Sequence, residues 1–284
     1  MAVAAGVGVF VGGGQPSTIT TVHGETVPLF GRGVYRHDSL IVGSGSVGVD
    51  AVTLFLVLPL LAGAVVAHRR GSVRGTVTLL GVLTYCAYLY TSRAVDTAFN
   101  ELFLVYVAVM SVSLFALLWT VRSLPHTTLP QVMERLPRRS TAGFLLLLPL
   151  VLVAVWLPLV VEPLVTGQPA AAVEHYTTFV TGALDLGILL PTALVGAVLV
   201  LRRQVTGYLI AFSLAGFTAL LGPALIGMTI AQLQAGVEMG AADIVILVVS
   251  FLALSGFAAG VLLTALRRIP APDRAVSPPA RRLV

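Results

Sequence analysis

The chain has 284 residues, of which 57% are hydrophobic and 10% are charged, and its mean hydropathy is +0.98. Soluble domains carry about 25% charged residues, so this chain has too few polar side chains to cover a water-soluble globule. The net charge of +5 comes from short arginine clusters beside apolar segments, which favours contact with anionic lipid headgroups and argues against nucleic acid as a partner.

Apolar segments of membrane-spanning length recur along the chain. A spanning helix needs about 20 apolar residues, and eight segments approach that length: 1–14, 50–68, 75–91, 101–121, 141–162, 178–201, 206–231 and 242–266. The first is short and glycine-rich, so seven spans is the alternative. Because lipid offers no hydrogen-bond partners, residues 1–268 are predicted to form an all-α, polytopic transmembrane helix bundle.

Three segments between and after these spans have their own signals. In the loop 15–49, β-branched residues on both sides of Gly24 predict a small β-hairpin over Ile19–Val27. The loop 122–140 contains three prolines and is expected to hold a short interfacial helix. The tail 269–284 is basic and proline-rich, which predicts a disordered cytoplasmic tail.

Arginine is distributed unevenly between the two sides of this predicted bundle. All 17 basic residues are arginine, and cytoplasmic loops collect such residues. We therefore predict a multi-pass protein of the plasma (cytoplasmic) membrane with its C-terminus in the cytoplasm. Only Arg32, Arg36 and Arg93 fall on the outer side. The other fourteen are Arg69, Arg70, Arg74, Arg122, Arg135, Arg138, Arg139, Arg202, Arg203, Arg267, Arg268, Arg274, Arg281 and Arg282.

The two halves of the chain share a pattern that suggests an internal repeat. Gly63-Ala64-Val65 precedes an arginine pair by three residues, and Gly196-Ala197-Val198 does the same. Asp50 and Asp185 each precede a mid-helix proline. This pattern fits a 4+4 parallel duplication, and transporters with such repeats have sites at the repeat interface.

Asp185 is the most informative single residue. It lies about eight residues into its predicted span, where an unpaired charge costs several kcal/mol. It is expected to face the bundle interior or a water-filled vestibule, where it would contact a cation or solute. The alternative is an interhelical hydrogen bond that only fixes packing.

Other polar residues gather at the predicted outer ends of the spans. Asp50 and Glu101 begin spans there, where carboxylates also act as helix caps. Arg93, Asp96 and Asn100 lie within eight residues of Glu101, at spacings that bring side chains together on a helix. These residues are predicted to line the mouth of an outward-facing vestibule.

The outer loops add Arg36 and Asp38 to the predicted ligand-binding residues. The segment Glu174-His175-Tyr176, in a different outer loop, has the residue types to join them. Histidine and carboxylates can ligate a metal, but no diagnostic ligand spacing is present, so we predict an ordinary solvated loop without a metal site, in which Arg36 pairs with a carboxylate.

Several absences exclude function classes. The chain has no lysine, so a retinal Schiff base cannot form. Its single cysteine, Cys86, excludes an internal disulfide. No histidine falls in the middle of a span, which excludes a bis-histidine haem site. No phosphate-binding loop or common hydrolase signature is present, and no cofactor is predicted.

The stretch from Gly33 to Leu124 resembles uncharacterised multi-pass integral membrane proteins of high-GC bacteria, a resemblance that implies no particular activity. Three functions remain open. The first is non-enzymatic binding or translocation of a small solute or cation in an outward-facing vestibule. The second is an outer-face enzyme acting on lipid-linked substrates, such as a glycosyltransferase, with Asp38 as base. The third is a subunit of a membrane complex, with another membrane protein as partner.

Overall fold

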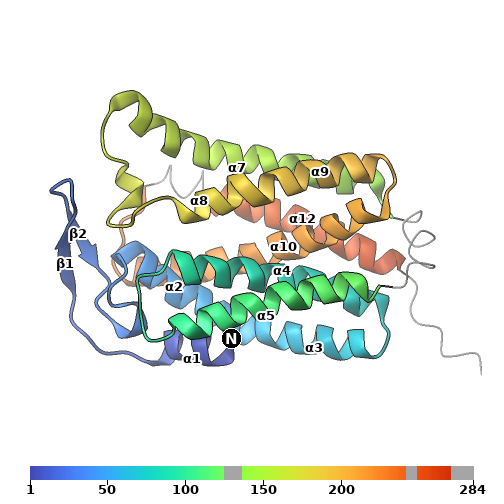
Figure 1. The fold of residues 1–284 in the computed structure, drawn as a ribbon, viewed down its shortest axis with the longest axis horizontal. Coiled ribbons are helices and arrows are strands. Elements are labelled where there is room, and N and C mark those ends of the chain that lie inside the picture. The colour runs from blue at the N-terminus through green and yellow to red at the C-terminus, as the bar shows by residue number, and fades with distance from the viewer. Residues whose placement is uncertain (125–135, 241–247, 270–284) are drawn as a thin grey trace, which may run out of the picture.

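A computed structural model describes residues 1–124, 136–240 and 248–269. In Figure 1 most helices lie side by side along the long axis of the molecule, and a β-hairpin lies at one end. The prediction of a helical bundle is confirmed. The predicted interfacial helix of the loop 122–140 falls mainly, and the disordered tail almost entirely, outside the described residues.

The chain begins with a short helix and the predicted hairpin. Helix α1 covers Ala2–Phe10; nine residues rise about 14 Å, less than half of a hydrocarbon core about 30 Å thick. Strands β1 (Ser17–Thr20) and β2 (Thr26–Leu29) pair in antiparallel register, with Ile19 opposite Val27. The hairpin prediction is therefore confirmed, and a short 3-10 turn, η1 (Gly33–Tyr35), follows it.

The first long helix starts ten residues earlier than expected. Helix α2 (Leu40–Val52), the π-helical turn η2 (Thr53–Val57) and α3 (Leu58–Arg69) are continuous. The side chain of Ser39 caps α2 by accepting a hydrogen bond from the Val42 N–H. The predicted start at residue 50 was wrong because the glycines and serines of 43–48 are typical of a loop, although here Gly45 and Gly48 pack against α10.

The remaining elements follow the predicted spans more closely. Helices α4 (Val73–Val95), α5 (Phe103–Arg122) and α7 (Arg138–Thr166) lead to a 3-10 turn, η3 (Ala171–Val173). A second continuous helix then combines α8 (Val180–Leu184), the π-helical turn η4 (Asp185–Leu189) and α9 (Leu190–Leu201). Helices α10 (Val205–Gln234) and α12 (Ser250–Arg268) complete the described bundle.

Six of the described helices are long and apolar enough to cross a membrane: Leu40–Arg69, Phe103–Arg122, Arg138–Thr166, Val180–Leu201, Val205–Gln234 and Ser250–Arg268. Helix α4 has 23 residues and packs against α3, α5 and α10. It is the most extensively buried of the helices that precede α10, and its face toward the bundle carries Tyr85, Tyr90 and Arg93.

The π-helical turns η2 and η4 have the same local cause. A proline follows each turn, Pro59 in α3 and Pro191 in α9. Proline lacks an N–H and its ring collides with the carbonyl four residues earlier, so the preceding turn widens. The N–H of Leu58 accordingly bonds the Thr53 carbonyl, and the N–H of Leu190 bonds the Asp185 carbonyl, five residues back.

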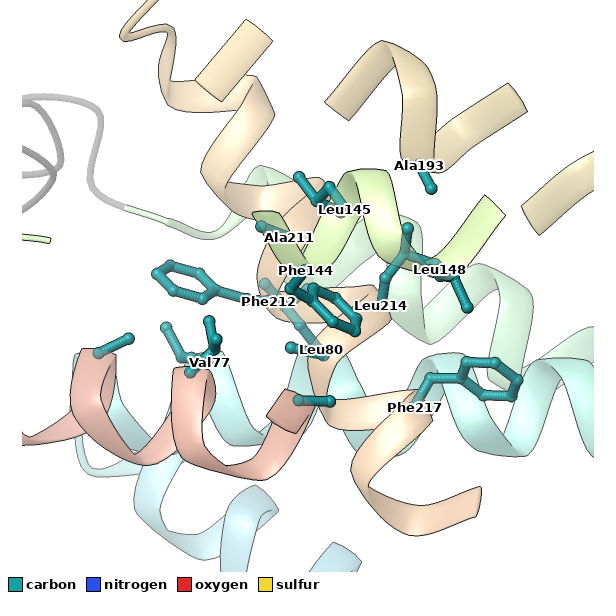
Figure 2. Packing of buried hydrophobic residues seen from close by; sticks show 14 of the residues in the cluster. Val77, Leu80, Phe144, Leu145, Leu148, Ala193, Ala211, Phe212, Leu214 and Phe217 are labelled. Carbon is teal, nitrogen blue, oxygen red and sulfur yellow. The ribbon is translucent and has the colours of Figure 1, made fainter. Parts of the chain in front are cut away.

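The apolar core lies where α4, α7, α9, α10 and α12 meet. Figure 2 shows Phe144, Leu145 and Leu148 from α7 packed near Phe212 and Leu214 from α10. Where two helices approach more closely, glycine replaces the large side chain. A Cβ on Gly81 of α4 would lie 2.5 Å from the Cα of Gly216 in α10, and one on Gly48 of α2 would lie 2.0 Å from the Gly227 carbonyl oxygen.

The Gly256-x-x-x-Gly260 motif in α12 does not form such a contact with the described residues. A Cβ built on either glycine meets no atom within 4 Å. The close helix contact that this motif permits is instead made in α10 by Gly216 and Gly227, whose partners come from distant parts of the chain.

Arginines gather at the end of the molecule opposite the hairpin. In Figure 1 the α3–α4 turn, the α9–α10 turn and the end of α12 all lie at that end. Arg74 donates to the Ile269 carbonyl from both Nε (2.8 Å) and Nη2 (2.6 Å), and Arg138 donates to the Leu201 carbonyl. Cations stabilise the free carbonyls and the negative dipole end of a helix C-terminus, so Arg74 and Arg138 stabilise helix ends.

Candidate functional site

A cavity of about 470 Å³ lies among α2, α4, α7, α8, α10 and α12. Its wall is mostly apolar, with aromatic side chains from several of these helices. The segment that joins α7 to α8 lines another part of it, through Ala172, Val173, Glu174, Tyr176, Thr178 and Phe179. A concave, mainly apolar pocket with a few converging polar groups is the usual form of a small-molecule site.

Asp185 stands in this wall and is only 6% exposed. Its Oδ1 accepts a hydrogen bond from the Tyr88 hydroxyl at 2.6 Å, and its Oδ2 accepts one from Trp156 Nε1 at 2.8 Å. Tyr88 and Trp156 also line the cavity. Asp185 is the first residue of η4, so the widened helical turn before Pro191 positions it between α4 and α7.

Two further carboxylates line the same cavity. Asp96 follows the end of α4 and accepts a hydrogen bond from the Thr181 hydroxyl at 3.1 Å. Glu174 lies in the connection between α7 and α8 and accepts a hydrogen bond from the Ser39 hydroxyl. Partial burial raises the pKa of the Glu174 carboxyl, and the bond from Ser39 opposes that rise.

The connection 167–179, which we call the strap, is tied to the start of α2. The Tyr176 hydroxyl donates to Asp38 Oδ1 at 3.0 Å and accepts from the Ser39 N–H at 3.2 Å. The backbone of Glu174 has φ = 54°, a left-handed conformation that costs a non-glycine residue energy. The strap therefore holds a strained residue against the first half of the chain, over the cavity.

Asp38 is fully buried and organises this contact. Besides the bond from Tyr176, its Oδ1 accepts the Ala98 N–H at 2.8 Å, while its Oδ2 has no hydrogen-bond partner among the described residues. Burial raises the pKa of the Asp38 carboxyl, and the Ala98 and Tyr176 bonds oppose the rise. Asp38 thus links the loop that precedes α2 to the strap and to the α4–α5 connection.

Asp50 and Arg93 lie together but do not line the cavity. Arg93 Nη2 is 3.4 Å from Asp50 Oδ1 and donates to the Ser46 carbonyl at 3.1 Å. The Tyr35 hydroxyl donates to Asp50 Oδ2 at 2.5 Å, and the Arg93 guanidinium lies 4.9 Å from the centre of the Tyr35 ring. This buried ion pair ties η1, α2 and α4 together.

Glu101 and Arg36 form a second, exposed ion pair, with Nη2 of Arg36 2.5 Å from Oε1 of Glu101. The hydrogen bond from Arg36 lowers the pKa of the Glu101 carboxyl. Asn100 accepts the Leu102 N–H on its Oδ1 at 2.9 Å and stabilises the turn before α5. Of the eight residues predicted to bind ligand, the structure therefore brings Asp185 and Asp96 to the cavity and the other six to neighbouring contacts.

The segments 35–38 and 174–176 meet in a hydrogen-bonded contact, so the prediction of a solvated loop is wrong at Asp38, which is fully buried, whereas Arg36 does pair with a carboxylate. Asp38 and Ser39 face Glu174 and Tyr176. Within the described ranges, no group of three histidine, cysteine, aspartate or glutamate side chains is arranged to hold a metal ion. Sequence reasoning did not single out Trp156, whose signal was only that it is one of two tryptophans in the chain.

The comparisons with known proteins give no relative for this arrangement. No family model, no curated protein and no solved structure matches the chain. The fold and the cavity therefore define its class by themselves: a helical bundle with six described helices able to cross a membrane and an acidic, aromatic cavity among its helices.

Proposed function

We propose that the protein binds, and in doing so carries or senses, a small solute in the cavity around Asp185, without catalysing a reaction. The observation that supports this most strongly is the convergence of three carboxylates and an aromatic wall on one space of about 470 Å³. The base that the enzymatic alternative needs is less available, because Asp38 is fully buried.

The cavity would face the outside of the cell. The strap and the hairpin belong to the end of the bundle that carries few arginines, and the arginine-rich turns belong to the opposite end. Under the positive-inside rule, the arginine-rich end is cytoplasmic, the membrane is the plasma membrane, and solute enters from outside past the strap.

The two halves of the chain would be a duplicated unit. The π-helical turns start at Thr53 and Asp185, which are 132 positions apart, and the same spacing separates the starts of α4 and α10. It also separates Gly75 from Gly207, and each of these glycines packs against the helix that precedes it. When the two halves are aligned with this spacing of 132 residues, the counterpart of Asp185 is Thr53 and not Asp50.

A parallel duplication places a ligand site between its halves, and the cavity is lined from both: α2 and α4 belong to the first unit, and α8 and α10 to the second. Seven long helices would cross the membrane, counting α4. An eighth crossing would require α1 to be part of a longer span.

Filling the cavity tests this function whatever the chemical identity of the solute. Leu225 and Ile226 are neighbours in α10; Leu225 lines the cavity, while Ile226 is 45% exposed on the surface. Wild type, Leu225→Trp and Ile226→Trp would be purified from native membranes, and their bound small molecules compared by mass spectrometry. We expect a compound in wild type and Ile226→Trp that is absent from Leu225→Trp. Equal small-molecule content in all three would contradict a solute site here.

A further inference from the structure

Asp185 is a buried carboxylate without a cationic partner among the described residues. Its two hydrogen-bond donors, Tyr88 and Trp156, are both neutral. The other carboxylate buried within a long helix, Asp50, has Arg93 beside it. A carboxylate removed from water is costly unless a positive charge compensates it, so the Asp185 site lacks a charge that a bound cation would supply.

The other charged residues that line the cavity are also negative. Asp96 and Glu174 add two more carboxylates, and no arginine or histidine is among the described residues that line the cavity. An anionic ligand would meet three carboxylates in the wall, whereas Arg93 and His175, which interact electrostatically with Asp96 and Glu174 respectively, lie outside the lining. The cavity therefore selects for positive charge.

The residues that line the cavity also favour an organic cation over a metal ion. Aromatic rings attract ammonium groups through their faces, and the cavity is lined by Tyr85, Tyr88, Trp156, Tyr176, Phe179 and Phe251. An inorganic cation needs several oxygen ligands at short distances, whereas most of this wall is apolar. A volume of about 470 Å³ suits a molecule of many atoms.

We propose that this cavity binds an organic cation with an apolar body, a substituted ammonium whose positive group lies beside Asp185 and whose body contacts the aromatic wall. This proposal rests on the proposed solute-binding function and names its ligand class. The second lone pairs of the Asp185 oxygens remain available for the ammonium. Trp156 and Tyr88 hold the carboxylate in place, and Phe179 and Phe251 contact the apolar body.

The molecule contains its own reporter for a test. The chain has two tryptophans: Trp119 is 76% exposed in α5, and Trp156 lines the cavity. The variant Trp119→Phe leaves Trp156 as the single tryptophan of the chain. The protein would be reconstituted into nanodiscs of neutral lipid. Three ligands of similar size would be titrated: benzyltrimethylammonium, neutral benzyl alcohol and anionic phenylacetate.

We expect saturable quenching or shifting of Trp156 fluorescence by benzyltrimethylammonium, and at least tenfold weaker binding of the other two compounds. Asp185→Asn should weaken cation binding at least tenfold and leave the weak benzyl alcohol binding unchanged. Glu101→Gln, which removes an exposed carboxylate outside the cavity, should leave cation binding unchanged. Because Asp185→Asn alters a buried contact, Phe251→Leu provides a second test: it removes an aromatic contact with the apolar body, so it should weaken binding of the ammonium and of the alcohol alike.

The possible outcomes distinguish a failure of the proposed ligand class from a failure of the proposed solute-binding function. If the alcohol or phenylacetate binds saturably and at least as tightly as the ammonium, the cavity is a solute site but the cation proposal is wrong. If benzyltrimethylammonium binds equally to wild type, Asp185→Asn and Phe251→Leu, the proposed contacts are wrong. If none of the three compounds binds saturably, and Leu225→Trp and wild type release the same small molecules, the proposal and the function both fail.

Discussion

At the scale of single residues, two arginine–carboxylate pairs near the same end of the bundle have opposite surroundings. Arg93 and Asp50 are 7% and 4% exposed in their side chains, and Arg36 and Glu101 are 40% and 63% exposed. Breaking a buried pair leaves an uncompensated charge in a medium that solvates it poorly, whereas an exposed group is solvated by water. The two pairs should therefore respond differently to the same substitution.

We predict that Arg93→Met lowers the free energy of unfolding by about 3–5 kcal/mol, since Asp50 would keep only its bond from Tyr35. The matched substitution Arg36→Met should produce no measurable change. Denaturant unfolding of the purified proteins in mixed micelles, followed by tryptophan fluorescence, gives both values. In the double variant Arg93→Met/Asp50→Leu most of the loss should return; a double variant as unstable as Arg93→Met would show that the arginine acts through its packing alone.

At the scale of helices, the crossing of α4 and α10 depends on having no side chain at Gly81. We predict that Gly81→Ala destabilises the protein by about 1–3 kcal/mol, because its Cβ would lie 2.5 Å from the Cα of Gly216. In Gly143→Ala, where a Cβ meets no described atom within 4 Å, higher helix propensity should instead stabilise by up to about 1 kcal/mol. Thermal unfolding of both variants measures the difference, and equal shifts would contradict the close crossing.

These glycines also show what the sequence can and cannot predict about the fold. Hydropathy located most helices within a few residues, because apolar length is a local property. It failed at α2, where Gly45 and Gly48 look like loop residues until Met228 and Gly227 of α10 are placed against them. That contact joins positions about 180 residues apart, and no local pattern contains it.

For the candidate site, too, some features can be predicted from the sequence and others only from the packing of the helices. An acid within an apolar span was enough to predict that Asp185 faces the bundle interior, where it is buried. Its partners Tyr88 and Trp156 are 97 and 29 positions away in the chain, so only the packing of α4, α7 and η4 reveals them. Glu101 and Asp50, which begin predicted spans and were also predicted to line the vestibule, have arginine partners and do not reach the cavity.

The strap is the element whose movement would admit a ligand. Tyr176→Phe removes the hydroxyl that bonds Asp38 and Ser39 but keeps the ring. Each hydrogen bond contributes about 1 kcal/mol, so the strap should open more often. In the Trp119→Phe background, we expect stronger acrylamide quenching of Trp156. Tyr106→Phe is the control, because its hydroxyl has no hydrogen-bond partner among the described residues. Unchanged quenching in Tyr176→Phe would mean that these bonds do not control access.

At the scale of the whole molecule, the direction in which the cavity opens follows from the orientation of the bundle. The hairpin and strap end has Arg32, Arg36 and Arg93, whereas the turns after α3 and α9 carry Arg69, Arg70, Arg202 and Arg203. Insertion favours keeping arginine-rich short loops in the cytoplasm. Because the helices form one packed bundle around a shared core, the orientation of any one turn determines that of the cavity.

We predict that a cysteine at the hairpin tip, Val22→Cys, reacts with a membrane-impermeant maleimide on intact cells, whereas Arg203→Cys reacts only after permeabilisation. Val22 is 97% exposed and Arg203 lies in the exposed α9–α10 turn. The background is Cys86→Ala, since Cys86 is the single cysteine of the chain and is buried. Labelling of Arg203→Cys from outside, with Val22→Cys protected, would reverse the bundle. Asp185 would then meet solute arriving from the cytoplasm, and the strap would control release into the cell interior instead of entry from outside.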